Sequence, residues 1–357
     1  MLFAPYPSPA LRLKNRIVMA PMTRNRAVDS NTPNALMAEY YGQRAGAGLI
    51  VTEGTSPSPN GLGYPRIPGL FNDAHVAGWR LVTDAVHAHG AKIFVQLMHT
   101  GRIGHPANLP AGARVLGPTD TPCSGQMYTD AQGLQPHPAP EPMTVADIQA
   151  AVAEFAQSAA LAVKAGFDGI ELHAANGYLL EQFLNANVNT RNDDYGGSAA
   201  NRMRFVLDVA RATVETIGAN RVGIRLSPFG VFNDTGAFEG MEEQYLTLAR
   251  ELSALRVVYL HLVEHSALGA PEVPAAFKAR LQTAFAGTFI ASGGFDRDRA
   301  ERALAEGRAD LVAFGRPWIA NPDLVERMQA GHKLATPDPA TFYSPGPVGY
   351  TDYPRAS

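Results

Sequence analysis

Cysteine is nearly absent from this chain of 357 residues, since Cys123 is the only one. A single thiol excludes an internal disulfide and any metal site built from several thiolates, and it fits a reducing cytoplasm. Long apolar runs are missing too, because none approaches the roughly 18 residues needed to span a bilayer. The stretch from Met1 to Pro9 has no basic region followed by an apolar core, so it does not resemble a signal peptide. We therefore expect a cytoplasmic protein with no membrane partner.

The chain also lacks a strong excess of charge of one sign: the net charge is −3, and no block of like charges occurs. Nucleic acids and anionic membranes are bound through such basic blocks, so we expect neither as a partner. Apolar side chains are plentiful, at 46% of residues, which is enough for a large core. The length alone favours two domains, but α/β barrels run to about 250 residues or more as one domain. A monomer and a small homo-oligomer both remain open.

Short apolar runs typical of buried strands alternate with stretches of helical period. Strands are expected at Ile17–Ala20, Leu49–Thr52, Lys92–Leu97, Gly169–His173, Val222–Leu226, Val257–Val263, Thr288–Ala291 and Asp310–Phe314. Helices are expected from Thr32 (the cap) to about Gly46, Asp73 to His89, Thr144 to Gly166, through Phe205 to Gly218, Met241 to Leu255, Pro274 to Ala284, Asp296 to Glu306, and up to about Ala330. Eight strands alternating with eight helices predict a (β/α)8 TIM barrel in one domain over residues 1–357. A small hairpin is expected at Leu11–Ile17. A doubly wound sheet alternates in the same way, but no G-x-G-x-x-G follows a strand here.

One connection is far longer than the others. Residues 99–143 are rich in glycine and proline and show weak periodicity, where a barrel needs only a short turn. A loop of this length in a compact domain is usually functional or carries small elements of its own. We expect this excursion after the third strand to form a lid or subdomain over the site.

The stretch from Gly169 to Tyr178 is the strongest candidate for chemistry. It begins as a buried strand, and polar side chains follow at its carboxyl end, where α/β enzymes place their sites. His173 and Asn176 are two hydrogen-bond donors able to share one substrate oxygen, and Tyr178 is positioned to deliver a proton. The alternative is an ordinary strand end with a histidine satisfied by its neighbours.

The other strand ends predict a cofactor with an aromatic ring and a phosphate. Phosphate in barrels sits near the ends of strands seven and eight, where Gly294, Gly315 and Arg316 lie. Further strand-end residues are Thr23, Gly54, Gln96 and Arg225. A structural salt bridge is the alternative for Arg225. No lysine ends a strand, which disfavours Schiff-base chemistry, and the strand ends lack a metal-binding cluster.

Several motifs along nearly the whole chain resemble those of the old yellow enzyme family of flavin ene-reductases. They are Pro21-Met22-Thr23, Gln96-Leu-Met-His-Thr-Gly-Arg102, His173-Ala-Ala-Asn176-Gly-Tyr178, Tyr195-Gly-Gly-Ser198, Gly223-Ile-Arg225-Leu-Ser-Pro228, Phe314-Gly-Arg-Pro317 and Gly349-Tyr-Thr-Asp-Tyr-Pro354. The resemblance implies FMN as cofactor and NADPH or NADH as reductant. Around the isoalloxazine it places Pro21, Met22, Thr23, Gly54, Gln96 and Arg225. It assigns the phosphate to Gly294, Gly315 and Arg316, and the substrate to His173, Asn176, Tyr64 and Tyr343.

The resemblance also implies a reaction. Alkenes conjugated to a carbonyl or nitro group would accept hydride from flavin N5, with Tyr178 as the proton donor. One residue departs from the family pattern, since many members carry tryptophan where this chain has Met98; this difference bears on substrate range. The alternatives are an FMN barrel of the 2-hydroxy-acid oxidase type, with a histidine as base, and a non-catalytic flavin-binding barrel.

Overall fold

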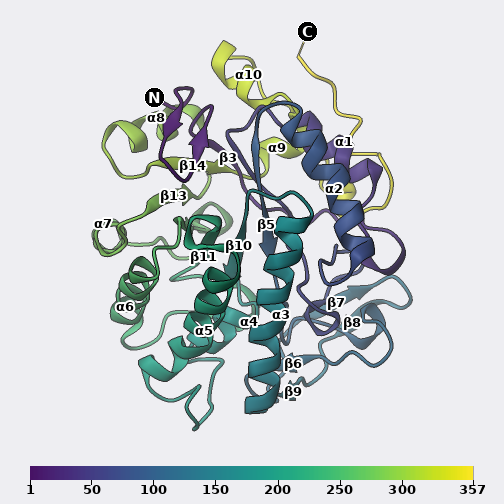
Figure 1. The fold of residues 1–357 in the computed structure, drawn as a ribbon, viewed down its shortest axis with the longest axis vertical. Coiled ribbons are helices and arrows are strands. Elements are labelled where there is room, and N and C mark those ends of the chain that lie inside the picture. Colours follow the sequence, from purple (N-terminus) through teal and green to yellow (C-terminus); the bar gives the residue numbers. More distant parts are fainter. Residues whose placement is uncertain (357) are drawn as a thin grey trace.

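Eight parallel strands close into a barrel in the computed structural model, which describes residues 1–356 (Figure 1). Going round the barrel in chain order, the strands are β3 (Ile17–Met19), β4 (Leu49–Val51), β5 (Lys92–Leu97), β10 (Gly169–Ala174), β11 (Val222–Leu226), β12 (Tyr259–Val263), β13 (Thr288–Ser292) and β14 (Leu311–Phe314). Strand β14 pairs with β3, which closes the ring. Because all eight strands are parallel, their carboxyl ends meet at one face of the barrel.

Helices surround the barrel, as Figure 1 shows. They are α1 (Ala35–Gln43), α2 (Asp73–His87), α3 (Val145–Lys164), α4 (Leu179–Leu184), α5 (Ala199–Ile217), α6 (Met241–Ala254), α7 (Ala275–Ala284), α8 (Arg297–Ala305), α9 (Pro317–Ala320) and α10 (Leu324–Ala330). The predicted TIM barrel is therefore confirmed. Within the described residues, no helix is long and apolar enough to cross a membrane.

Side-chain caps explain where several helices begin. Thr144 caps α3 as predicted, and Asp147 completes a capping box by bonding back to the Thr144 backbone. The prediction for α1 was wrong: Asn34, not Thr32, is the cap, and its side chain accepts a hydrogen bond from the Met37 amide. The Thr32 hydroxyl instead donates to the Asp29 carbonyl at 2.8 Å.

Other boundaries also differ from the prediction. The N-terminal hairpin pairs β1 (Tyr6–Pro7) with β2 (Arg12–Leu13), so its first strand begins earlier than expected. The last predicted helix is divided into α9 and α10 around Asn321, whose backbone angles, φ −129° and ψ 83°, are not helical. Helix α4 was missed because its six residues are too few to show a helical period.

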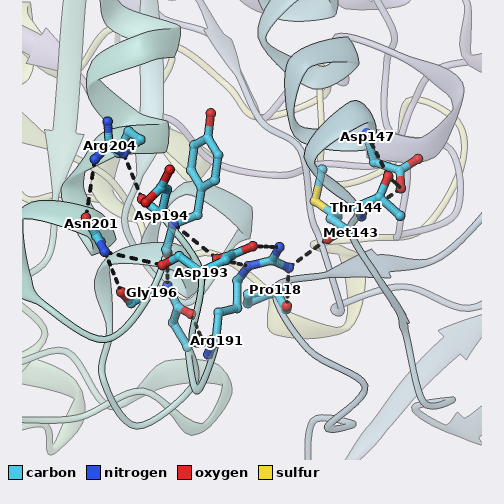
Figure 2. Close-up of polar contacts among 12 residues, drawn as sticks. Pro118, Met143, Thr144, Asp147, Arg191, Asp193, Asp194, Gly196, Asn201 and Arg204 are labelled. Atoms are coloured by element: carbon cyan, nitrogen blue, oxygen red, sulfur yellow. Dashed lines mark hydrogen bonds and ion pairs between the residues drawn. The ribbon is translucent and has the colours of Figure 1, made fainter.

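Residues 99–143 form two small sheets rather than a featureless loop. One is an antiparallel hairpin of β7 (Gln126–Thr129) and β8 (Gly133–Pro136); the other pairs β6 (Leu116–Gly117) with β9 (Glu141–Pro142). Arg191 holds the base of this segment, because its guanidinium donates to the carbonyls of Pro118 and Met143 at 2.8 and 2.7 Å (Figure 2). Asp193 pairs with the same guanidinium and keeps it in place.

Candidate active site

A cavity of about 420 Å³ opens at the carboxyl ends of the barrel strands. Predicted site residues that line it are Pro21, Met22, Thr23, Gly54, Tyr64, Gln96, His173, Asn176, Tyr178, Arg225, Arg316 and Tyr343. The prediction missed Arg24, Phe232, Asn233, His265, Leu268, Ile319 and Phe342, which also line it. Sequence analysis therefore predicted where the cavity lies, but not all of the residues that line it.

The turn after β10 brings the predicted catalytic side chains together. Asn176 and Gly177 both adopt positive φ, at 59° and 74°, a region that asparagine and glycine tolerate better than other residues. A Cβ on Gly177 would lie 2.6 Å from the Asn233 Cβ, so a side chain there would collide. The turn places the His173 and Tyr178 rings edge to face, with centroids 4.9 Å apart.

A buried carboxylate lies beneath this turn. Glu181 accepts hydrogen bonds from the Gly177 amide at 2.6 Å, the Ser227 hydroxyl at 2.8 Å and the Tyr245 hydroxyl at 3.2 Å. Burial raises the pKa of Glu181 to about 7, and these hydrogen bonds oppose the rise only in part. Sequence analysis did not identify Glu181, because nothing in an all-buried helix singles out one acidic residue.

His173 is a neutral hydrogen-bond donor. Burial, together with the positive charge of Arg225, holds the pKa of His173 well below its usual value. Its Nδ1 is buried and has no partner among residues 1–356. A neutral imidazole carries one N–H, so His173 can donate to a substrate oxygen without bringing a charge into the cavity.

Tyr178 is held in its protonated form. Its hydroxyl oxygen lies 3.0 Å from that of Tyr64, and the two rings meet edge to face. Burial raises the pKa of Tyr178 above its ordinary value and raises that of Tyr64 further. A phenol that keeps its proton near neutral pH has the state that a proton donor requires.

Gln96, which lines the cavity, belongs to a buried polar network around Glu171. Its carboxylate accepts from the Gln96 amide at 2.8 Å and the Tyr259 hydroxyl at 3.0 Å, and it contacts His261 Nδ1 at 2.9 Å. Burial alone would raise the pKa of Glu171, but His261 and Arg225 keep it below the usual value. The acidic residue inside the apolar run Gly-Ile-Glu-Leu was the available signal for this network, and sequence analysis did not use it.

Arg225 lines the cavity, and its guanidinium is incompletely hydrogen-bonded. Its Nε is buried without a partner, and no carboxylate in residues 1–356 forms an ion pair with it. The structural salt bridge considered as an alternative is therefore wrong. Buried polar groups are nearly always satisfied, so an arginine of this kind fits a bound polar cofactor.

The predicted phosphate residues lie at the ends of neighbouring strands, since β13 pairs with β14 through Ser292 and Ala313. Gly294 has a positive φ of 62°, and the space beside Gly315 is open to 3.8 Å. The Arg316 side chain is exposed and has no hydrogen-bond partner in the described chain. Gly294 and Gly315 do not line the cavity themselves, so their contact with phosphate stays a prediction.

Met98 occupies the space next to Gly54. A Cβ on Gly54 would lie 2.5 Å from the Met98 sulfur, so a side chain there would force the thioether to move. Met98 also packs in a cluster with Leu62 and Ile67, against the rings of Tyr64 and Tyr178. The cluster that contains the thioether therefore packs against both tyrosines.

Two buried arginines hold the segment that carries Tyr343. Arg24 donates to the carbonyls of Phe342 at 3.1 Å and Gly349 at 2.7 Å. Arg26 donates to the Phe342 carbonyl at 2.7 Å as well. These contacts place residues 342–349 against the cavity. The sequence signal was the pair of arginines that follows Thr23, which sequence analysis did not consider.

A second, outer cavity of about 780 Å³ adjoins the first. Thr23, Tyr64, Tyr178 and Tyr343 line both. Its other walls come from the β7–β8 hairpin, including Met127 and Leu134, and from residues 340–345. The segment 99–143 therefore forms part of the approach to Tyr178.

The comparisons with known proteins agree over nearly the whole chain. A family model described as the NADH:flavin oxidoreductase / NADH oxidase family matches residues 1–335. The chain is similar to 12-oxophytodienoate reductase 7 from Oryza sativa subsp. japonica, with 41% identity over 99% of this chain and 94% of the relative. A probable flavin mononucleotide-dependent alkene reductase from Leishmania infantum is 40% identical over 96% of this chain and 94% of its own length. The solved structure of morphinone reductase in complex with tetrahydroNAD has 42% identity and a TM-score of 0.94, covering 100% of this chain and 98% of that one.

The resemblance to the old yellow enzyme family, stated from the motifs, is confirmed by these matches. The donor set of the cavity, an unpartnered arginine beside a planar amide and an exposed arginine at the end of β14, suits FMN. The chain belongs to the NADH:flavin oxidoreductase / NADH oxidase family, and it is an FMN-dependent oxidoreductase whose reductant is NADH or NADPH.

Proposed function

We propose that this enzyme reduces alkenes conjugated to a carbonyl or nitro group. The observation that carries the proposal is the arrangement of three side chains at one cavity: a neutral His173, the amide of Asn176 and a protonated Tyr178. FMN, when bound, supplies the hydride. Pro21, Met22, Thr23, Gly54, Gln96 and Arg225 would hold its ring, and Gly294, Gly315 and Arg316 its phosphate.

His173 and Asn176 bind the substrate oxygen. Both offer an N–H donor at the carboxyl end of β10, and neither brings a formal charge. As electron density moves toward the oxygen, hydrogen bonds to it become stronger in a site with little water. The pair therefore stabilises the developing enolate and leaves the β-carbon ready to accept hydride.

Tyr178 then protonates the α-carbon. Its hydroxyl lies on the same cavity as the imidazole of His173 and within 3.0 Å of the Tyr64 hydroxyl. Tyr64 is the group that can stabilise the phenolate left behind and pass a proton on to it. Tyr64 and Tyr343 also line the space for the alkene, and we propose that residues 99–143 act as its lid.

The substitution Tyr178→Phe tests this assignment. It removes one hydroxyl and little volume, so flavin binding and reduction by NADPH should proceed at close to the normal rate. Loss of a positioned general acid typically costs about 10²–10⁴ in rate, and reoxidation by cyclohexenone should slow by roughly that factor. Tyr64→Phe is the comparison variant: it removes the neighbouring hydroxyl but leaves the proton donor, so it should slow reoxidation by less than Tyr178→Phe does. Stopped-flow traces of the two half-reactions measure both rates.

Three outcomes decide between the assignments. Equal slowing of both half-reactions by Tyr178→Phe would show that the residue shapes the pocket instead. Full activity with cyclohexenone would place the proton donor elsewhere. An enzyme of the 2-hydroxy-acid oxidase type would be bleached anaerobically by a 2-hydroxy acid, and cyclohexenone would not restore its flavin band. Nitroalkenes should be less affected by Tyr178→Phe than cyclohexenone, because a nitronate is stable enough to leave and take its proton from water.

A further inference from the structure

His265 contacts the substrate-binding turn from a different strand. It follows β12 and begins the 3₁₀ turn at Ser266–Leu268, and it lines the inner cavity. Its Nε2 lies 2.7 Å from the side-chain oxygen of Asn176, well within hydrogen-bond distance. None of the sequence motifs includes His265, and the reaction proposed above gives it no role.

The rest of Asn176 is already fixed. Its backbone amide donates to the Ser227 hydroxyl at 2.8 Å, and its carbonyl accepts from the Asn233 side chain at 2.7 Å. The backbone therefore settles where the residue lies, but not which face of its amide points into the cavity. The oxygen and nitrogen of an asparagine side chain are nearly equal in shape, so only hydrogen bonding can distinguish the two orientations.

The position of the proton on the His265 ring determines which way the Asn176 amide points. Burial, with the nearby charges of Arg225 and Arg316, lowers the pKa of His265 to about 4, so the ring is neutral near pH 7 and has a single N–H. With the proton on Nε2, the ring donates to the Asn176 oxygen and turns the amide N–H₂ toward the cavity. With the proton on Nδ1, it would accept from the amide, and the oxygen would face the substrate. Only the first arrangement stabilises a substrate oxygen.

We propose that His265 is a positioning residue, which holds the Asn176 amide with its donor toward the substrate oxygen. The inference rests on the proposed role of Asn176 in the function above. The Phe232 ring meets His265 edge to face at 4.5 Å and keeps the imidazole in line with the amide. His265 acts through Asn176 and needs no contact with substrate itself.

A double-mutant cycle tests this coupling with a readout other than turnover. His265→Phe and His265→Gln are each made with Asn176 intact and again with Asn176→Ala, all as holoenzymes. A phenol is the probe, because its oxygen should bind the same donors and its stacking on the flavin gives a long-wavelength band. Flavin retention is measured alongside, to show that each variant is folded.

The expected pattern has three parts. His265→Phe should weaken phenol binding about 3- to 10-fold, the usual size of one net hydrogen bond. His265→Gln should restore most of it, since its amide can also donate to the Asn176 oxygen. With Asn176→Ala, both His265 substitutions should lose their effect to within about 2-fold.

Failure of the positioning role of His265 can be distinguished from failure of the proposed function. If His265→Phe weakens phenol equally with and without Asn176, or leaves binding unchanged while Asn176→Ala weakens it, the positioning role is wrong and the proposed function stands. If Asn176→Ala itself leaves phenol binding unchanged, the assignment of Asn176 fails, and the role of His265 fails with it. If His265→Gln behaves like His265→Phe, orientation by a donor is refuted.

Discussion

Glu181→Gln should make the enzyme more stable at alkaline pH, although it removes a carboxylate with three hydrogen-bond donors around it. Among the described residues, no cation pairs with Glu181, and burial raises its pKa from 4.5 to about 7. The folded protein therefore binds a proton more tightly than the unfolded chain. The stability that this group contributes is complete below pH 4.5 and is lost as pH rises through about 7. Glutamine keeps the shape and an acceptor for the Gly177 amide but cannot ionise.

The size of the effect follows from the pKa. One pKa unit corresponds to about 1.36 kcal/mol, so a rise from 4.5 to about 7 amounts to about 3 kcal/mol of unfolding free energy. Unfolding entropy is about 2.1 cal/mol/K per residue near 60 °C, or about 0.75 kcal/mol/K for a chain of 357 residues. The difference in Tm between variant and parent should thus grow by about 4 °C between pH 5 and pH 8.5.

Thermal melts of both holoenzymes across that pH range measure this difference, in which the other titrating groups cancel. Glu215→Gln is the control, because it makes the same chemical change at a carboxylate that is exposed on α5. A Tm difference for Glu181→Gln that is constant from pH 5 to pH 8.5 would refute the reasoning. So would one that falls as pH rises, because it would mean that the charged carboxylate stabilises the turn.

Two further predictions concern the cofactor and the donor pair. Arg316→Ala should weaken FMN retention, because a charge-assisted contact to phosphate contributes roughly 1.5–3 kcal/mol; dialysis of parent and variant measures it, and equal retention would remove Arg316 from the phosphate site. The double substitution His173→Ala with Asn176→Ala should slow both half-reactions and abolish the long-wavelength band with phenols. A band that persists in the double variant would place the oxygen-binding site elsewhere.

The barrel could be predicted from the sequence because each strand is a short apolar run and each flanking helix has its own period. Thr144, for example, marks the start of α3 by a local hydrogen bond that any reader of the sequence can anticipate. The end of β10 could be predicted for the same reason, since His173, Asn176 and Tyr178 lie within six residues. A feature could be predicted from the sequence wherever it depends on residues that are close together in the chain.

Contacts between distant segments could not be predicted. His265 and Asn176 are 89 positions apart, and Glu171 meets His261 across 90. Their pairing depends on strand order and on register around the closed barrel, where β10, β11 and β12 lie side by side. Helix α4 was missed for a different reason, because its six residues are too few to show a helical period.

Residues 342–349 also carry a consequence for synthesis of the protein. The eighth barrel strand ends at Phe314, so every strand of the ring has been translated before these residues exist. Until then the buried guanidinium of Arg24 lacks two of its carbonyl acceptors, including that of Gly349, 325 positions later. We expect a released chain truncated after residue 335 to close its barrel yet leave the wall around Tyr343 unbuilt. Catalytic competence would then be acquired only after the barrel has folded, once residues 342–349 have docked on Arg24.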